Sequence, residues 1–119
     1  MAERVRWTAH KGKQVLYIDY SGLRGEEFLP VINKVPPFYA GQPDNTVLCL
    51  TDVRNAFGNE QVVEALKRIS KQMKRFERKS AVIGVTGIKG VLLMAVNLFS
   101  GQSIKSFDSE EQALDWLVA

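Results

Sequence analysis

Few side chains in this sequence are suited to catalysis or metal binding. The 119 residues include one histidine, His10, and one cysteine, Cys49. A nucleophile needs a base held against it, and a zinc site needs three or four nitrogen or sulfur ligands. Cys49 also lies in an apolar run, which favours a packing role. The sequence therefore predicts no metal, no cofactor and no enzyme.

Two aspartates each end a predicted strand. Asp19 lies near the end of the strand 14–20, and Asp52 closes the strand 47–52. Ligands bind at the carboxyl ends of strands in open α/β sheets, where two acids can work as an acid and base pair. Strand-end acids more often cap the turn that follows, and we favour that interpretation.

The segment Gly84-Val85-Thr86-Gly87-Ile88-Lys89-Gly90 lies between a predicted strand and helix, where a phosphate-binding loop is expected. It matches neither G-x-G-x-x-G nor G-x-x-x-x-G-K-[ST]. Residues 87–90 match the bare GxxG of RNA-binding KH domains, but there the loop joins two helices. We favour a tight turn. Free amides at the helix start, near Thr86 and Gly87, are the anion-binding alternative.

The predicted fold is organised around one central unit, which consists of a strand, a corner and a basic helix. The strand is 47–52, an apolar run typical of a strand buried on both faces. The corner is 55–59, with Asn59 as N-cap and Glu60 as the acid of the first helical turn. The helix runs to Phe76 and carries one apolar stripe: Val62, Leu66, Ile69, Met73 and Phe76. Together they form half of a βαβ unit.

The rest of the chain supplies further strands and helices. The other predicted strands are 4–10, 14–20, 80–85 and 103–107. The other predicted helices are 23–35, a helix capped by Thr86 that runs to Phe99, and a last helix capped by Ser109. A long loop, 36–45, is expected to fold onto the body. The order β-β-α-β-α-β-α-β-α predicts one α/β domain over residues 1–119, with a single mixed, mostly parallel sheet opened by a hairpin.

Composition indicates one ordinary globular domain with an uneven charge. No apolar run approaches the roughly 18 to 20 residues that span a bilayer, and no signal peptide is recognisable, so we expect a cytoplasmic protein. Residues 60–79 hold seven Lys or Arg against three Glu, a net of +4, which leaves −1 for the rest of a chain whose total is +3. The basicity therefore belongs to one helix.

The basic residues of that helix are predicted to share the face opposite the apolar stripe; they are Lys67, Lys71, Lys74, Arg75 and Arg78. The commonest explanation is a solvated face. However, like charges spaced i,i+4 each cost a few tenths of a kcal/mol, so a helix selected only for stability would alternate signs. An acidic protein or an anionic membrane is the alternative, and nucleic acid ranks last because no aromatic residues are interleaved.

The helix after Thr86 has more apolar residues than one face needs. One stripe is filled by Ile88, Val91, Leu92, Ala95, Leu98 and Phe99, and it is predicted to face inward. Leu93 and Met94 then project from the opposite side, and Val96 from the flank. A covering loop or a second subunit in a homodimer, a wall of an apolar pocket, and a membrane-touching helix are the alternatives.

The opening hairpin and three further segments, 46–53, 80–99 and 107–117, resemble the small bacterial SpoIIAA-like proteins. These belong to the STAS group, named for sulphate transporters and anti-sigma-factor antagonists, which shares a clan with the lipid-binding Sec14 or CRAL-TRIO domains. The resemblance covers about residues 14–117 and implies a non-enzymatic regulatory or binding domain. Anti-sigma-factor antagonists carry a phosphorylatable serine in an Asp-Ser-Ser/Thr-Gly corner. Here that corner reads Phe57-Gly58-Asn59-Glu60, so the usual phosphorylation switch is not expected.

Two functional hypotheses follow. In the first, the chain is a regulatory protein-interaction module that binds an acidic partner through Asn55, Phe57, Asn59, Glu60, Lys67, Lys71 and Lys74. In the second, it binds a lipid or other small apolar ligand near Thr86, Gly87, Leu93 and Met94, while the basic helix is attracted to anionic headgroups and the protein associates peripherally with membranes.

Overall fold

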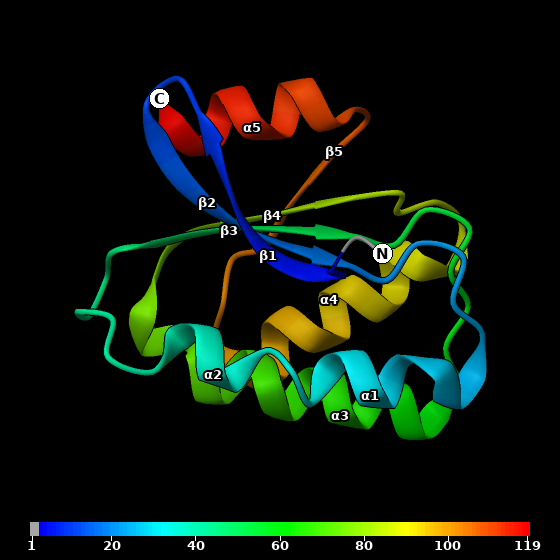
Figure 1. Cartoon of the computed structure of the whole chain (residues 1–119). Coiled ribbons are helices and arrows are strands. Elements are labelled where there is room, and N and C mark those ends of the chain that lie inside the picture. The colour runs from blue at the N-terminus through cyan, green and yellow to red at the C-terminus, as the bar shows by residue number, and fades with distance from the viewer. Residues whose placement is uncertain (1–2) are drawn as a thin grey trace.

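The computed structural model describes residues 3–119 and contains a five-stranded sheet in the order β1-β2-β3-β4-β5 (Figure 1). The strands are β1 (Val5–His10), β2 (Lys13–Asp19), β3 (Val47–Asp52), β4 (Glu77–Ile83) and β5 (Lys105–Phe107). β1 and β2 form an antiparallel hairpin, and each later strand pairs in parallel with the one before it. The predicted α/β class and mixed sheet are confirmed.

The helices lie on both faces of the sheet. One face is covered by α1 (Phe28–Ile32), α2 (Pro36–Tyr39), α3 (Glu60–Met73) and α4 (Ile88–Ser100), and α5 (Glu110–Val118) lies on the other (Figure 1). Each parallel crossover adds the next strand on the same side, and crossovers share one hand, so their helices gather on one face. No helix within residues 3–119 has both the length and the apolar character needed to cross a membrane.

Alternation along β3 divides the core into two clusters. Val47 and Cys49 face the layer of α1 to α4, whereas Leu48 and Leu50 face α5. All four are buried, because both faces of a central parallel strand are covered. The site described below lies in the layer beneath α3 and α4.

The segment between β2 and β3 differs from the prediction. Instead of one helix over 23–35 and a loop over 36–45, the chain forms a 3-10 turn (Gly25–Glu27), α1 and α2. Pro36 lacks an N–H group, and its ring would clash with the carbonyl of Ile32, the last residue of α1. Pro36 and Pro37 are tolerated at the start of α2. The prolines therefore split the predicted helix and start a new one.

Helix ends agree in part with the prediction. The Asn59 side chain accepts a hydrogen bond from the Val62 amide at 2.9 Å, which confirms the predicted N-cap. The predicted Thr86 cap is wrong by one residue, because the N-cap of α4 is Gly87 with a φ of 56°, a conformation that threonine adopts poorly. α3 ends at Met73 and a 3-10 turn (Lys74–Phe76) follows, so β4 starts at Glu77 rather than at residue 80.

Candidate functional site

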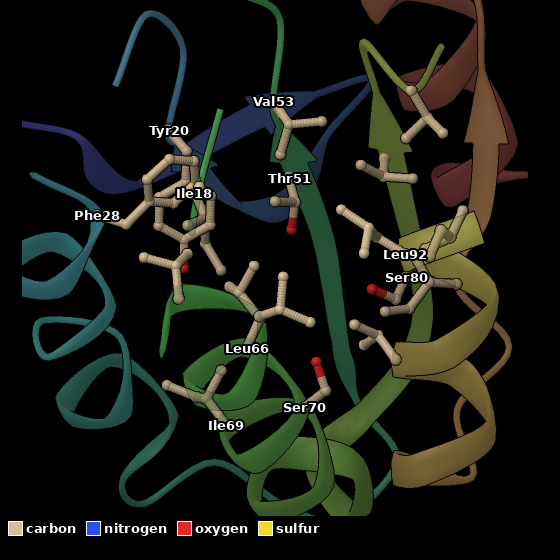
Figure 2. Close-up of a pocket in the computed structure, with 18 of the residues that line it drawn as sticks. Ile18, Tyr20, Phe28, Thr51, Val53, Leu66, Ile69, Ser70, Ser80 and Leu92 are labelled. Atoms are coloured by element: carbon tan, nitrogen blue, oxygen red, sulfur yellow. The ribbon is translucent and has the colours of Figure 1, made fainter. Parts of the chain in front are cut away.

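A cavity of about 210 Å³ lies between the sheet and the pair α3 and α4. Figure 2 shows Leu66, Ile69 and Ser70 rising from α3, Leu92 coming from α4, and Thr51 and Val53 from β3 and its end. Further apolar lining comes from Ile18, Val62, Val63, Met73, Val82, Ile88, Leu93 and Val96. The arrangement is a largely apolar compartment with a few polar groups, which is how small-molecule sites are built.

Small strand residues create the space. On the cavity side, β3 presents Cys49 and Thr51, and β4 presents Ser80, while the facing turn of α3 carries Ser70. None of these side chains is long enough to fill the layer between sheet and helices. Close packing is the rule for protein interiors, so a void bounded by four small residues is a specific feature of this sequence.

Glu77 is the one acidic side chain among the residues that line the cavity. The Tyr39 hydroxyl donates to its Oε1 at 2.6 Å, whereas its Oε2 is buried and has no hydrogen-bond partner among residues 3–119. Burial raises the pKa of Glu77 to about 7, although the nearby Tyr39, Ser80 and Gln102 side chains oppose the rise. A carboxyl group in this state is poised between its charged and neutral forms near neutral pH.

A β-bulge directs Glu77 to the cavity. Val47 pairs with Glu77, and Leu48 pairs with Lys79, so Arg78 is an extra residue on β4. Strict alternation from Ser80 would have turned residue 78, not residue 77, toward the helices. Sequence reasoning missed Glu77, because it counted residues 60–79 with the basic helix and began the next strand at residue 80. An acid at the start of a strand was the only available signal.

Phe57 and Lys89 form the rim of the cavity at the corner after β3. Phe57 is 50% exposed, and the Lys89 Nζ lies 4.6 Å from the centre of its ring. Lys89 also donates to the carbonyl of Val53 at 2.8 Å. Burial, together with the charge of Arg24, lowers the pKa of Lys89. Because Phe57 both lines the cavity and meets solvent, the cavity reaches the surface here.

α4 is rotated about its axis relative to the prediction, so that Val96 and Leu93 face inward while Met94 stays exposed. The predicted inward stripe is largely exposed, with Leu98 at 85%, whereas Val96 is buried at 8% and Leu93 lines the cavity. The Asn97 amide exchanges hydrogen bonds with the backbone of Ile104, at 3.1 and 3.2 Å. When apolar residues lie on several sides of a helix, hydrophobicity alone does not select the inner face, and polar contacts of this kind favour one orientation.

The exposed side of α4 is called here the α4 outer face, and it consists of Ile88, Val91, Met94, Leu98 and Phe99. The basic helix borders it. The Nζ of Lys71 lies 5.2 Å from the centre of the Phe99 ring, and that of Lys67 lies 6.0 Å away. Lys74 is next to Gly101, just beyond α4. Three predicted partner-binding lysines therefore form a row beside an exposed apolar surface.

The other predicted site residues are more dispersed. Asn55 is in the left-handed region at φ 56°, and the Asn59 side chain is occupied as the α3 cap. Glu60 is exposed in the first turn of α3, at the end of the helix away from Lys71 and Lys74. Thr86 and Gly87 are exposed and lie outside the cavity lining, as does Met94. Of the predicted ligand-binding residues, Leu93 alone lines the cavity.

Both strand-end aspartates cap turns, as favoured from the sequence. Asp19 Oδ1 accepts from the Ser21 amide at 2.8 Å, and Asp52 Oδ1 accepts from the Arg54 amide at 3.0 Å. Asp52 is buried, which opposes ionisation, but hydrogen bonds from Arg54 and Tyr17 outweigh this effect and lower the pKa of Asp52. Both aspartates therefore stabilise the turns that follow their strands.

His10 and Cys49 also have structural places, His10 in a hydrogen bond and Cys49 in the core. The Nε2 of His10 lies 2.8 Å from Asp115 Oδ1, which links β1 to α5. Burial raises the pKa of the Cys49 thiol to about 12, so the thiol stays neutral and weakly nucleophilic. No group of three or more His, Cys, Asp or Glu residues suited to a metal ion occurs within residues 3–119.

Comparison with solved structures identifies the fold. An uncharacterised protein of the DUF3478 family with a SpoIIAA-like fold, from Shewanella loihica PV-4, superposes with a TM-score of 0.70 at 16% identity, over 95% of this chain and 91% of that one. An anti-sigma-factor antagonist (STAS) domain protein from Planctomyces limnophilus gives 0.61 at 16% identity, over 95% and 96%. No protein-family model and no curated protein sequence matches the chain. The fold is SpoIIAA-like, as the resemblance implied.

Proposed function

We propose that this chain is a non-enzymatic binding module that holds a small apolar ligand in the cavity beneath α3 and α4. The observation that carries the proposal is the cavity itself, which is apolar except for a few placed polar groups. The proposal is also supported by the two strand-end aspartates and the histidine, which are hydrogen-bonded within the structure, and by the cysteine, which is buried.

The volume limits the ligand. A cavity of roughly 150 Å³ lined by aliphatic and aromatic residues is large enough to bind benzene. At about 210 Å³, this cavity suits a ligand somewhat larger than benzene, such as a bicyclic aromatic compound or one short alkyl chain. A lipid with two acyl chains does not fit within it.

The test is an NMR titration of the protein with naphthalene. We expect amide shifts on the cavity side of β3, β4, α3 and α4, and at least a tenfold weaker Kd in Ser70→Phe, which places a ring in the cavity. Ser103→Phe is the matched control, because Ser103 is exposed and lies outside the cavity lining. The absence of binding to the wild-type protein, or equal binding to both variants, contradicts the proposal.

A second candidate function is docking of an acidic protein partner on the α4 outer face. Five large apolar side chains are exposed there, and a lysine row borders them. Such a patch, with an apolar centre and a charged border, has the composition of an interaction surface. One protein of similar structure is described as an anti-sigma-factor antagonist (STAS) domain protein. The Phe57–Glu60 corner has no hydroxyl group, so we infer regulation without phosphorylation at this position.

In-cell photo-crosslinking tests this docking. A photoreactive residue at position 94, on the α4 outer face, is expected to capture a protein partner, and one at Glu111, exposed on α5, is the control. Lys67→Glu with Lys71→Glu should abolish the product. Crosslinks to a second copy of this chain assign the face to a homodimer, and salt-sensitive flotation with anionic vesicles, without a protein product, assigns it to a membrane. Either result overturns the protein-partner candidate.

A further inference from the structure

Glu77 is not accounted for by binding of a purely apolar ligand. Its Oε1 accepts from the Tyr39 hydroxyl, but its Oε2 is buried and has no partner among the described residues. Buried polar side chains are nearly always hydrogen-bonded, and leaving one unpaired costs about 1–3 kcal/mol or more. The unpaired Glu77 Oε2 beside the apolar cavity would therefore be stabilised by a hydrogen-bond donor.

Among the described residues, no neighbouring side chain forms a hydrogen bond to this Oε2. The Ser80 and Gln102 side chains lie close enough to lower the pKa of Glu77, but the amide nitrogen of Gln102 donates to the carbonyl of Ser70 at 2.7 Å. A second hollow, lined by Lys74, Arg75 and Arg78, borders Glu77, yet none of these basic groups forms an ion pair with it in the part of the chain that the structure describes. The hydrogen-bond donor for this oxygen would therefore come from a molecule in the cavity.

We propose that Glu77 is the polar anchor of the cavity and accepts a hydrogen bond from a hydroxyl or N–H group on an otherwise apolar ligand. This inference rests on the proposed ligand-binding function and narrows its ligand class. Glu77 starts β4, while Phe57 and Lys89 lie at the opposite ends of the parallel strands. The ligand's donor group therefore lies beside Tyr39 and Met73, and its apolar part extends along α3 toward the rim.

Two probes of matched size test the inference. 2-Naphthol carries a hydroxyl donor where 2-methylnaphthalene carries a methyl group, so the ratio of their Kd values isolates the donor. We expect this ratio to shift by about tenfold or more in favour of 2-methylnaphthalene on going from wild type to Glu77→Leu, because a hydrogen bond to a charged group contributes at least that much. Tyr39→Phe, which keeps Glu77, should retain most of the wild-type preference.

Each outcome has a defined meaning. If both probes bind and the ratio is the same in wild type and Glu77→Leu, the anchor role is wrong while the ligand-binding function survives. If neither probe binds the wild-type protein, the proposed function fails as well. Should Glu77→Leu not fold, the carboxyl ¹³C signal of Glu77 in the wild-type protein gives the answer. Saturating 2-naphthol should lower the pKa of Glu77, and 2-methylnaphthalene should not; no difference between the probes overturns the proposal.

Discussion

Asp52 and Arg54, two residues apart, form a hydrogen-bonded ion pair at the end of β3. The guanidinium of Arg54 donates to both carboxylate oxygens of Asp52, at 2.8 Å and 3.1 Å, and its backbone amide donates at 3.0 Å. The carboxylate is buried and the guanidinium is half exposed. The contact closes the turn that leads from the central strand to the corner at the cavity rim.

Arg54→Ala is expected to lower the free energy of unfolding by about 2–3 kcal/mol at pH 7, because it leaves a buried charge without its main partner. The pKa of Asp52 is lowered in the folded protein, so its contribution is present above the unfolded pKa of about 4 and is lost as pH falls below it. Urea unfolding at pH 7 and pH 3 should show the deficit shrinking in acid. A deficit that is the same at both pH values contradicts this account.

Glu77→Gln is expected to change how stability depends on pH. Burial raises the pKa of Glu77 from its ordinary 4.5 to about 7, so the folded state binds the proton more tightly than the unfolded state. Wild-type stability should therefore fall as pH rises from about 5 to 8, by on the order of 3 kcal/mol, and the Glu77→Gln substitution should remove this component. Of the groups packed around Glu77, Tyr39 and Cys49 also titrate, but burial raises both pKa values far above this range. Parallel unfolding curves for the two proteins across that range would contradict the prediction.

Val96→Ala and Leu98→Ala test the orientation of α4. Val96 is buried at 8% and Leu98 is 85% exposed, so we expect Val96→Ala to cost about 1–2 kcal/mol and Leu98→Ala to stay within about 0.5 kcal/mol. Chemical denaturation at one pH measures both. If α4 were turned as the sequence stripe predicts, the order of the two effects would reverse.

Gly84→Ala is expected to destabilise the turn between β4 and α4. The backbone there has φ 91°, and a Cβ would lie 2.5 Å from the amide nitrogen of Arg54. We expect a loss of about 2 kcal/mol or more in thermal or urea unfolding. Gly90→Ala is the matched control, since Gly90 is helical with nothing near its Cβ position, and the change should raise stability by up to about 1 kcal/mol.

Features set by local chemistry could be predicted from the sequence. The apolar run 47–52 predicted the central strand, the first two strands predicted the opening hairpin, and Asn59 predicted the start of α3. The strand-end aspartates were recognised as turn caps because their chemistry depends on residues two positions away. Strand and cap patterns of this kind need only short-range information.

Features set by distant contacts could not be predicted. The inner face of α4 depends on Asn97 reaching Ile104, and hydrophobic periodicity carries no record of that contact. The position of Glu77 depends on a bulge opposite Val47, which shifts the alternation of side chains by one residue. The predicted basic face also changes, because Arg78 belongs to β4 rather than to the basic helix. The place of Lys67 and Lys71 beside Phe99 follows from how two helices pack.

Ligand occupancy of the cavity beneath α3 and α4 is coupled to the stability of the folded protein. At about 24 cal/mol per Å³, a sealed void of 210 Å³ would cost on the order of 5 kcal/mol, and one that reaches the surface costs less. That is a large part of the roughly 5–15 kcal/mol that holds a typical domain together. A ligand present at one hundred times its Kd would raise the free energy of unfolding by about 2.7 kcal/mol. The lifetime of this protein under thermal or proteolytic stress should therefore report how much of its ligand is present.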